Sequence, residues 1–167
     1  MLTIAFTVLV ALGVAFLFFV TYGRAESWAL VFGNPDLGSF DRSAPMRAAR
    51  PNDALLCTPG LCDGVAVDIE LPDFAGPPAR LIAEIDEAMH ASGEIYRRVD
   101  DTSDPAQSRY VTWTPLMRFP DTSSFEAVPL ENGRVGLVAY GRAQIGYSDR
   151  GVNRRRLKEI VSRLQAG

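Results

Sequence analysis

The chain has 167 residues and a formal net charge of −3, with 17 basic against 20 acidic residues. Nucleic-acid binding needs a basic face over much of a domain, so this charge argues against nucleic acid as a partner. Once an apolar start and a proline-rich connector are set aside, roughly 110 residues remain, which is the size of one ordinary domain. We therefore expect a single hydrophobic core.

The N-terminal segment predicts a transmembrane helix. Residues 2–22 carry no charged side chain, and about 21 residues at a rise of 1.5 Å give about 31 Å, enough to cross a bilayer core. A cleaved signal peptide is the rival interpretation, because Gly23-Arg24-Ala25 loosely resembles a cleavage site. The length of the apolar run and the lack of Lys or Arg before it favour an uncleaved anchor over residues 1–23.

Small side chains recur at every fourth position of this segment, at Thr3, Thr7, Ala11 and Ala15. Such a stripe lets a second helix approach closely, which is how membrane spans associate when lipid removes the hydrophobic driving force. Chance is the alternative, because Ala and Thr are common in any span. The stripe is our candidate helix-packing face, and it predicts larger integral membrane subunits as partners.

Two signals disagree about the side of the membrane. Four arginines follow the span: Arg24, Arg42, Arg47 and Arg50. By the positive-inside rule they put the domain in the cytoplasm. The two cysteines of the chain, Cys57 and Cys62, lie in a Pro/Gly loop where they are able to close a small disulfide, which requires an oxidising compartment. Two thiols and one distant histidine cannot complete a tetrahedral zinc shell, so we expect no metal.

A connector over residues 24–54 separates the anchor from the domain. From residue 33 it is rich in Pro, Gly, Asp and Arg and has no sustained period of 2 or 3.6. We interpret it as a linker that either hangs free or lies along a partner's surface. The α+β domain is then expected over residues 55–167.

The first half of this domain predicts a strand, a helix and two further strands. Apolar residues alternate over 64–71, the signature of a half-buried strand. Pro78 is suited to open a helix with one apolar face, and Gly93 to end it. Residues 94–99 and 109–114 read as strands.

The second half predicts a hairpin and a helix. A strand over 125–130 is followed by Asn132-Gly133, which favours a type I′ turn, and by a return strand over 134–145. An amphipathic helix follows over 153–165. The order β-α-β-β-β-β-α predicts an α+β fold in which a small, mostly antiparallel sheet carries two packed helices on one face.

The segment 146–156 joins the last strand to the last helix and places three arginines in the helix's first turn. Cations there oppose the helix dipole, so they need partners. A capped turn with locally paired or solvated arginines is one interpretation, and a protein-contact surface is another. The third is an anion or lipid-headgroup site, with these candidate binding residues: Ser148, Asp149, Asn153, Arg154 and Arg156.

Two stretches of the sequence stand out: Tyr-Val-Thr-Trp-Thr-Pro-Leu-Met-Arg-Phe-Pro-Asp at residues 110–121, and the Ser-Asp-x-Gly-x-Asn-Arg pattern that begins at Ser148. Both resemble the corresponding stretches of a known family, the domain of unknown function 1499. The resemblance covers about residues 50 to 165. The family's usual Pro-Asn-Cys is Gly60-Leu61-Cys62 here, and Gln144 stands where an Arg is expected. The resemblance implies no established activity, and it implies a tethered or exported bacterial protein, which favours the periplasmic side.

The sequence offers no catalytic constellation of nucleophile and base, carboxylate pair or metal. His90, the one histidine, is expected on a helix surface, and the acidic turn at 100–104 lacks calcium-loop spacing. We therefore expect a protein that is not an enzyme and uses no cofactor. A hydrolase with an unrecognised site would need a deep pocket around His90 or an acidic pair.

The leading hypothesis is a non-catalytic accessory subunit of a larger complex in the bacterial inner membrane. It is held by one span and has its domain in the periplasm, and a respiratory or other energy-transducing complex is a natural host. The alternative is a membrane-tethered periplasmic domain that binds an anionic ligand or lipid headgroup through the 148–156 segment.

Overall fold

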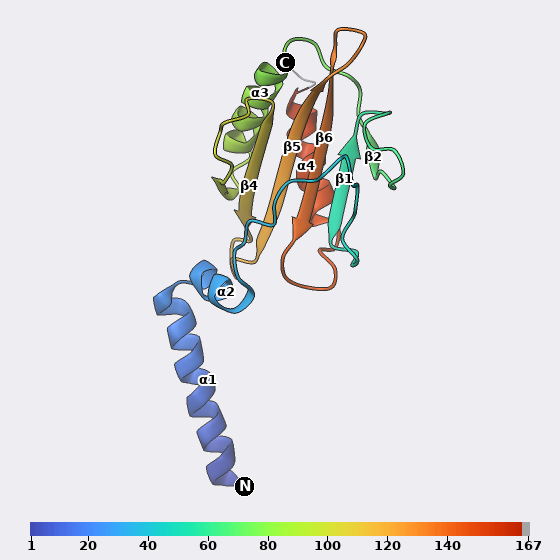
Figure 1. The fold of residues 1–167 in the computed structure, drawn as a ribbon. Coiled ribbons are helices and arrows are strands. Elements are labelled where there is room, and N and C mark those ends of the chain that lie inside the picture. The colour runs from blue at the N-terminus through green and yellow to red at the C-terminus, as the bar shows by residue number, and fades with distance from the viewer. Residues whose placement is uncertain (165–167) are drawn as a thin grey trace.

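The computed structural model describes residues 1–164 and confirms the α+β fold with an N-terminal apolar helix (Figure 1). Its elements in chain order are α1 (Leu2–Tyr22), α2 (Arg24–Phe32), β1 (Asp53–Cys57), β2 (Ile69–Glu70), α3 (Pro78–Ala91), β3 (Ile95–Arg98), β4 (Gln107–Trp113), β5 (Pro120–Pro129), β6 (Val135–Ala143) and α4 (Val152–Leu164).

The strands form one six-stranded sheet in the order β2-β1-β6-β5-β4-β3. Only the edge pair β1 and β2 is parallel, with Leu56 opposite Ile69, and every other pair is antiparallel. The central hairpin of β5 and β6 pairs from Asp121 opposite Ala143 to Pro129 opposite Val135. Helices α3 and α4 lie side by side on one face of this sheet (Figure 1).

The main core lies between the sheet and these two helices. Both helices were predicted, and in each the apolar residues recur every three or four positions, so one stripe of the helix faces the sheet. The buried members include Leu81, Ile82, Ile85, Met89, Leu157, Ile160 and Val161 of the helices, which pack on Tyr110, Phe125 and Leu137 of the strands. Each fully buried aliphatic side chain contributes about 1.5 to 3 kcal/mol.

The opposite face of the sheet is covered by the connector, residues 33–52. Phe40 is buried against Tyr140, with ring centroids 5.0 Å apart, in a second apolar cluster that includes Leu55 and Val138. The backbone N–H of Leu37 donates to Thr122 Oγ1 (3.1 Å), and that of Phe40 donates to Ser124 Oγ (3.2 Å). The connector is therefore a packed layer of its own domain, where the sequence left open a free linker or one lying along a partner.

Two bidentate ion pairs fasten this layer at separate points. Arg109 of β4 donates to both carboxylate oxygens of Asp36 (2.7 and 3.0 Å). Arg42 of the connector donates to both oxygens of Glu126 on β5 (2.8 and 2.7 Å). Planar, two-point pairing of this kind fixes orientation as well as position, so the connector is held in one register on the sheet.

The first strand prediction was largely wrong. Most of residues 64–71 is irregular, and only Ile69–Glu70 pairs with β1. The strand next to it, β1, was not predicted, and the boundary expected between residues 54 and 55 falls inside it. β1 is short and apolar on both faces, since Ala54 and Leu56 face the helices while Leu55 and Cys57 face the connector. It therefore lacks the alternation that marks a half-buried strand.

The predicted hairpin forms between β5 and β6, but not through a type I′ turn. The N–H of Leu130 donates to the carbonyl of Arg134 (2.8 Å), and the N–H of Gly133 donates to that of Leu130 (3.0 Å). Gly133 has a positive φ of 75° whereas Asn132 does not. This is the three-residue loop in which a single left-handed glycine closes the turn.

The N-terminal helix α1 is the one helix among residues 1–164 that is long and apolar enough to cross a membrane, and none of its span is buried against the domain. A signal sequence near an N-terminus has the same length and composition. At Gly23, φ is +116°, which interrupts the helix and starts α2 in a new direction. Helix α2 lies between α1 and the sheet (Figure 1).

Candidate functional site

The start of α4 is capped by Asp149. Its two carboxylate oxygens accept the backbone N–H groups of Gly151 (2.9 Å) and Asn153 (2.8 Å). A carboxylate at this position satisfies amide groups that the helix leaves unpaired and also offsets the helix dipole. Asp149 thus supplies the negative charge that the arginines of the first turn require.

Asn153 fixes the distance between α4 and the sheet. Its side chain is fully buried and lies over Gly141 of β6, where an added Cβ would stand 2.9 Å from Asn153 Oδ1. Its Nδ2 donates to the carbonyl of Asn52 (3.4 Å), just before β1. The glycine is needed for this close approach, and Asn153 ties α4 to two strands at once.

Arg156 lies at the centre of a buried polar cluster. Its guanidinium contacts Asp121 on β5 and Glu94 before β3, both at 3.0 Å, and also donates to Asn153 Oδ1 (3.0 Å). Its side chain is 4% exposed. Burial acts to lower the pKa of Arg156, but attraction to Asp121 and the bond to Glu94 outweigh it and raise the pKa. The arginine therefore stays charged and joins α4 to two other segments.

The candidate anion-site residues are divided between the interior of the domain and its surface. Arg156 points inward to its two carboxylates, whereas Ser148 and Arg154 lie on the surface. Arg154 reaches the backbone carbonyl of Asp68 (3.4 Å), and Arg155 reaches that of Arg150 (3.0 Å). The structure thus brings Asp149, Asn153 and Arg156 together where α4 begins against the sheet. Ser148 and Arg154 lie outside this group, on the surface.

A second polar cluster, which the sequence did not indicate, lies under the connector. Arg47 donates to both oxygens of Asp53 (3.0 and 2.8 Å) and lies 2.8 Å from Asp68. The hydroxyl of Tyr140 donates to Asp53 Oδ2 (2.9 Å). Burial alone would raise the pKa of Asp53, but hydrogen bonds from Arg47, Ala48 and Tyr140 leave it below its ordinary value. The cluster closes the beginning of β1 against the connector.

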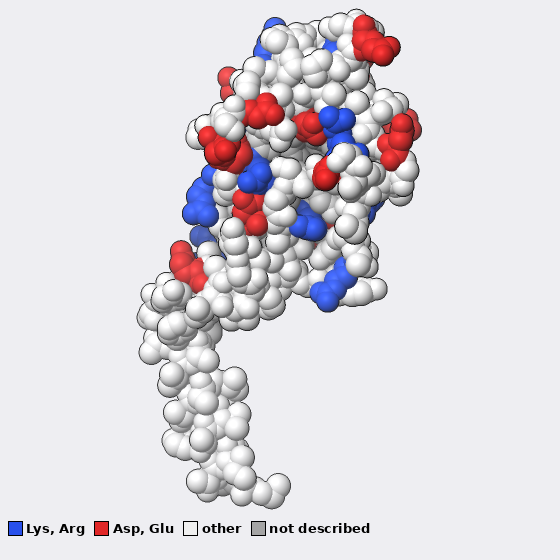
Figure 2. All heavy atoms as spheres, in the orientation of Figure 1, with Lys and Arg blue, Asp and Glu red and all other residues white. Residues whose placement is uncertain are grey.

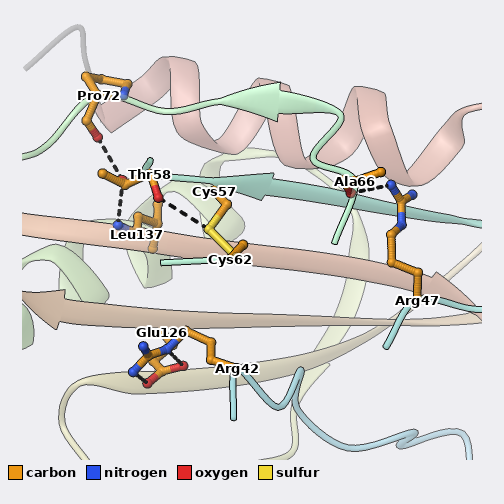
Figure 3. Close-up of a disulfide and its surroundings, with 9 residues drawn as sticks. All are labelled: Arg42, Arg47, Cys57, Thr58, Cys62, Ala66, Pro72, Glu126 and Leu137. Carbon is orange, nitrogen blue, oxygen red and sulfur yellow. Dashed lines mark hydrogen bonds and ion pairs between the residues drawn. A yellow bond between two sulfur atoms is a disulfide. The ribbon is translucent and has the colours of Figure 1, made fainter. Parts of the chain in front are cut away.

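The disulfide lies on the same face. Cys57 and Cys62 are joined (Figure 3), and both residues belong to the apolar cluster around Phe40. Next to it, the Thr58 hydroxyl accepts the N–H of Leu137 (2.9 Å) and donates to the carbonyl of Pro72 (3.1 Å). The bridge and this threonine together anchor the irregular segment between β1 and β2.

The other residues considered for chemistry have local roles. His90 is on the exposed side of α3. In the acidic turn, Asp100 pairs with Arg98 (2.9 Å), while Asp101 and Asp104 accept hydrogen bonds from their own turn. Among residues 1–164 no group of His, Cys, Asp or Glu side chains has the arrangement of a metal site.

An open groove of about 500 Å³ is lined by α3 and by the end of α4, and this end of α4 lies away from α1 (Figure 1). Phe74, Ala88, Ala91 and Leu164 form its apolar part, and Arg80, Glu84, Glu87 and Arg163 its charged part. Arg80 and Glu84 pair on the helix surface at 2.8 Å. His90 is not among its lining residues, so the groove is not the pocket around this histidine that a hydrolase was expected to need; for the other expectation, an acidic pair, the groove holds Glu84 and Glu87.

The packing stripe of α1 is fully accessible. Thr3, Thr7, Ala11 and Ala15 are all exposed, and the hydroxyl of Thr7 donates to the carbonyl of Thr3 (2.9 Å). This bond satisfies the hydroxyl within the helix. The stripe therefore presents small side chains with no contact to the rest of the domain.

The comparisons with known proteins agree with the resemblance seen in the sequence. The family model described as "Protein of unknown function (DUF1499)" matches residues 62–164, which is more than half of the chain and includes Asp121, Asp149, Asn153 and Arg156. A search of curated proteins and one of solved structures gave no match. The chain belongs to the DUF1499 family of proteins of unknown function.

Proposed function

We propose that this protein is a non-catalytic accessory subunit of a larger complex in the bacterial inner membrane, anchored by α1 with its domain in the periplasm. The observation that carries the proposal is the unpartnered apolar surface of α1. Its candidate span, Thr3–Tyr22, has no buried share, which leaves its whole apolar surface available to lipid or to other membrane helices. A respiratory or other energy-transducing complex is the kind of host we have in mind.

The state of the charged residues supports a structural role for the domain. Arg156, the central residue of the alternative anion site, is committed to Asp121 and Glu94. Arg42, Arg47 and Arg109 are likewise paired with carboxylates of the same chain. Charged side chains used in this way stiffen a domain rather than receive a ligand, which favours the accessory subunit over the anion-binding module.

The disulfide supports the periplasmic side. A bridge between Cys57 and Cys62 is expected to persist in an oxidising compartment and to be rare in the cytosol. The arginines that the positive-inside rule counts after the span include Arg42 and Arg47, which fold into ion pairs. We give the disulfide more weight for this reason.

The test is affinity purification of a tagged full-length chain from native membranes in a mild detergent. A Thr7→Leu/Ala11→Leu variant fills the small-residue stripe, and a Leu9→Ile/Leu17→Ile variant is the matched control with unchanged apolar character. We expect larger membrane subunits to co-purify in fixed ratio with the wild type and the control, and to be reduced with the filled stripe. Recovery of the wild-type chain alone would overturn the proposal.

A further inference from the structure

The end of the domain next to α1 carries an exposed apolar surface formed by two segments. One is the last turn of α2, with Leu30 (67% exposed), Val31 (68%) and Phe32 (49%). The other is the β4–β5 loop, residues 114–119, with Leu116 (74%) and Met117 (37%). We call these five side chains the α2–loop surface. Exposed apolar residues that gather in this way mark an interaction site more often than scattered ones do.

Most backbone groups of the loop are hydrogen-bonded within the protein. The carbonyl of Met117 accepts the indole N–H of Trp28 (2.7 Å), and the carbonyl of Leu116 accepts the guanidinium of Arg24. Within the loop, the N–H of Thr114 donates to the carbonyl of Phe119 (3.0 Å), and those of Arg118 and Phe119 donate back to Thr114. With outward apolar side chains and most backbone groups paired, the loop is suited to the headgroup and upper acyl region, while Arg118, whose Nη1 is buried without a partner among residues 1–164, keeps it out of the hydrocarbon interior.

An aromatic cluster joins this surface to α1. Trp28 packs on Phe19 of α1 (ring centroids 5.3 Å apart), on Phe32 of α2 (5.9 Å) and on Phe119 of the loop (5.1 Å). The end of α1, α2 and the loop are thus packed as one unit.

The α2 part of the α2–loop surface follows the apolar surface of α1 closely along the chain, with Arg24 and Glu26 at the start of α2 between them. Helix α1 ends at Tyr22, and α2 begins after one residue, at Arg24. Charged side chains gather on the sheet-and-helix body and do not occur along α1 (Figure 2). Where an apolar span meets its domain, tryptophan and tyrosine favour the headgroup level of the bilayer, and Tyr22 and Trp28 lie at this junction.

We propose that the α2–loop surface inserts into the headgroup and upper acyl region of the bilayer, so that the domain is docked on the membrane surface. The proposal rests on α1 being retained as a span, and it does not depend on a host complex. Docking sets the height of the domain and turns the groove at its other end away from the membrane, toward soluble partners or neighbouring subunits.

The test uses the full-length chain alone in nanodiscs of phosphatidylcholine and phosphatidylglycerol. Both native cysteines are in the disulfide, so an introduced cysteine is the single thiol for a nitroxide label. Labels at Val31→Cys and Leu116→Cys are compared with Glu131→Cys in the β5–β6 turn and with Leu9→Cys in α1. Collision rates with oxygen, which concentrates in lipid, and with a water-soluble nickel chelate report the depth of each label.

We expect the labels at 31 and 116 to collide more with oxygen than with nickel, as the label at 9 does, and the label at 131 to show the reverse. Replacing Met117 by Glu should move the label at 31 toward the aqueous ratio, whereas Glu131→Gln should not. If the label at 116 in the lone chain collides more with nickel than with oxygen, the proposal is overturned. The same holds if this label becomes protected from nickel only when host subunits are present. If the label at 9 collides more with nickel than with oxygen, α1 does not span the bilayer, and the docking proposal fails together with the span.

Discussion

Arg156 and Asp121 form an ion pair of 3.0 Å between α4 and β5, with side chains only 4% and 8% exposed. The pair lies within the residues matched by the family model. It accounts for an arginine in the first turns of a helix, a position where cations are otherwise unfavourable. The Arg156–Asp121 pair therefore has a structural role, because it connects α4 to β5.

Removing Arg156 should destabilise the protein strongly. We expect Arg156→Ala to lower the free energy of unfolding by about 3 to 5 kcal/mol, because Asp121 is left buried without its partner. Chemical denaturation of the full chain in detergent, followed by circular dichroism, measures the change. Arg155→Ala, at an exposed position of the same turn, is the control and should change stability by less than about 0.5 kcal/mol. Equal effects of the two substitutions would contradict the assignment of Arg156 to the fold.

The disulfide gives a second prediction. Cys57 and Cys62 are separated by five positions, and opening so short a loop should cost about 2 kcal/mol of stability by the chain-entropy relation. A Cys57→Ser/Cys62→Ser variant compared with the wild type, by the same denaturation experiment, tests this figure. The side of the membrane is tested in acid-quenched cells by alkylation with a maleimide of high mass. The electrophoretic mobility of the chain should decrease only when the disulfide is reduced before alkylation. Free thiols in untreated cells would put the domain on the reducing side of the membrane.

The packing of Phe40 on Tyr140 should be needed to keep the connector against the sheet. Its replacement by Ala removes the aromatic contact with Tyr140 and should cost about 3 kcal/mol. The rate of hydrogen–deuterium exchange should then rise at the backbone amides of positions 37 and 40, which donate hydrogen bonds to β5 in the wild type. Met46→Ala is the control, because Met46 is exposed in the same connector. Unchanged exchange in the Phe40→Ala variant would show that the ion pairs alone hold the connector.

The Asp53 cluster predicts a defined pH dependence. Since the pKa of Asp53 in the folded protein lies below its ordinary value of 3.8, its contribution is present above that pH and is lost as the pH falls through the folded value. Burial and the bond to Asp53 also raise the pKa of Tyr140 to about 12, so stability should fall again above about pH 10, where the unfolded tyrosine ionises.

Unfolding midpoints measured from pH 2 to pH 11 test both limbs. In an Asp53→Asn variant the acidic limb should flatten, because the titrating carboxylate is gone. A Tyr140→Phe variant should make the alkaline limb shallower, and the part that remains is assigned to Tyr110, whose pKa is also raised by burial and by its bond to Asp86. An acidic limb as steep in Asp53→Asn as in the wild type would assign the acid sensitivity to other carboxylates.

Much of the fold follows from local sequence patterns. The apolar run of α1, the apolar stripes of α3 and α4 and the Asn132-Gly133 turn each act over a few residues, and their elements were predicted. β1 was missed because five residues, apolar on both faces, carry no periodic signal. The packing of the connector was missed because its partners, such as Asp36 with Arg109, lie far apart in sequence.

In the candidate site too, local features could be predicted from the sequence, whereas contacts between distant residues could not. Ser148 to Arg156 were recognised as an unusual segment from the dipole argument and from the family resemblance. The partners of Arg156, namely Asp121 and Glu94, are 35 and 62 residues away, and no spacing rule connects them. The unusual placement of arginines is visible in the sequence, whereas the partners of Arg156 are visible only in the folded structure.

The most direct test of the accessory-subunit proposal is the size of the particle that carries the untagged chain in native membranes. Native electrophoresis after mild solubilisation, with the chain detected by antibody, gives this size, and mass spectrometry of the band gives its composition. We predict a band several times larger than the 18.2 kDa chain that contains multi-spanning subunits in fixed ratio. Migration as a single chain in its detergent micelle would contradict the proposal.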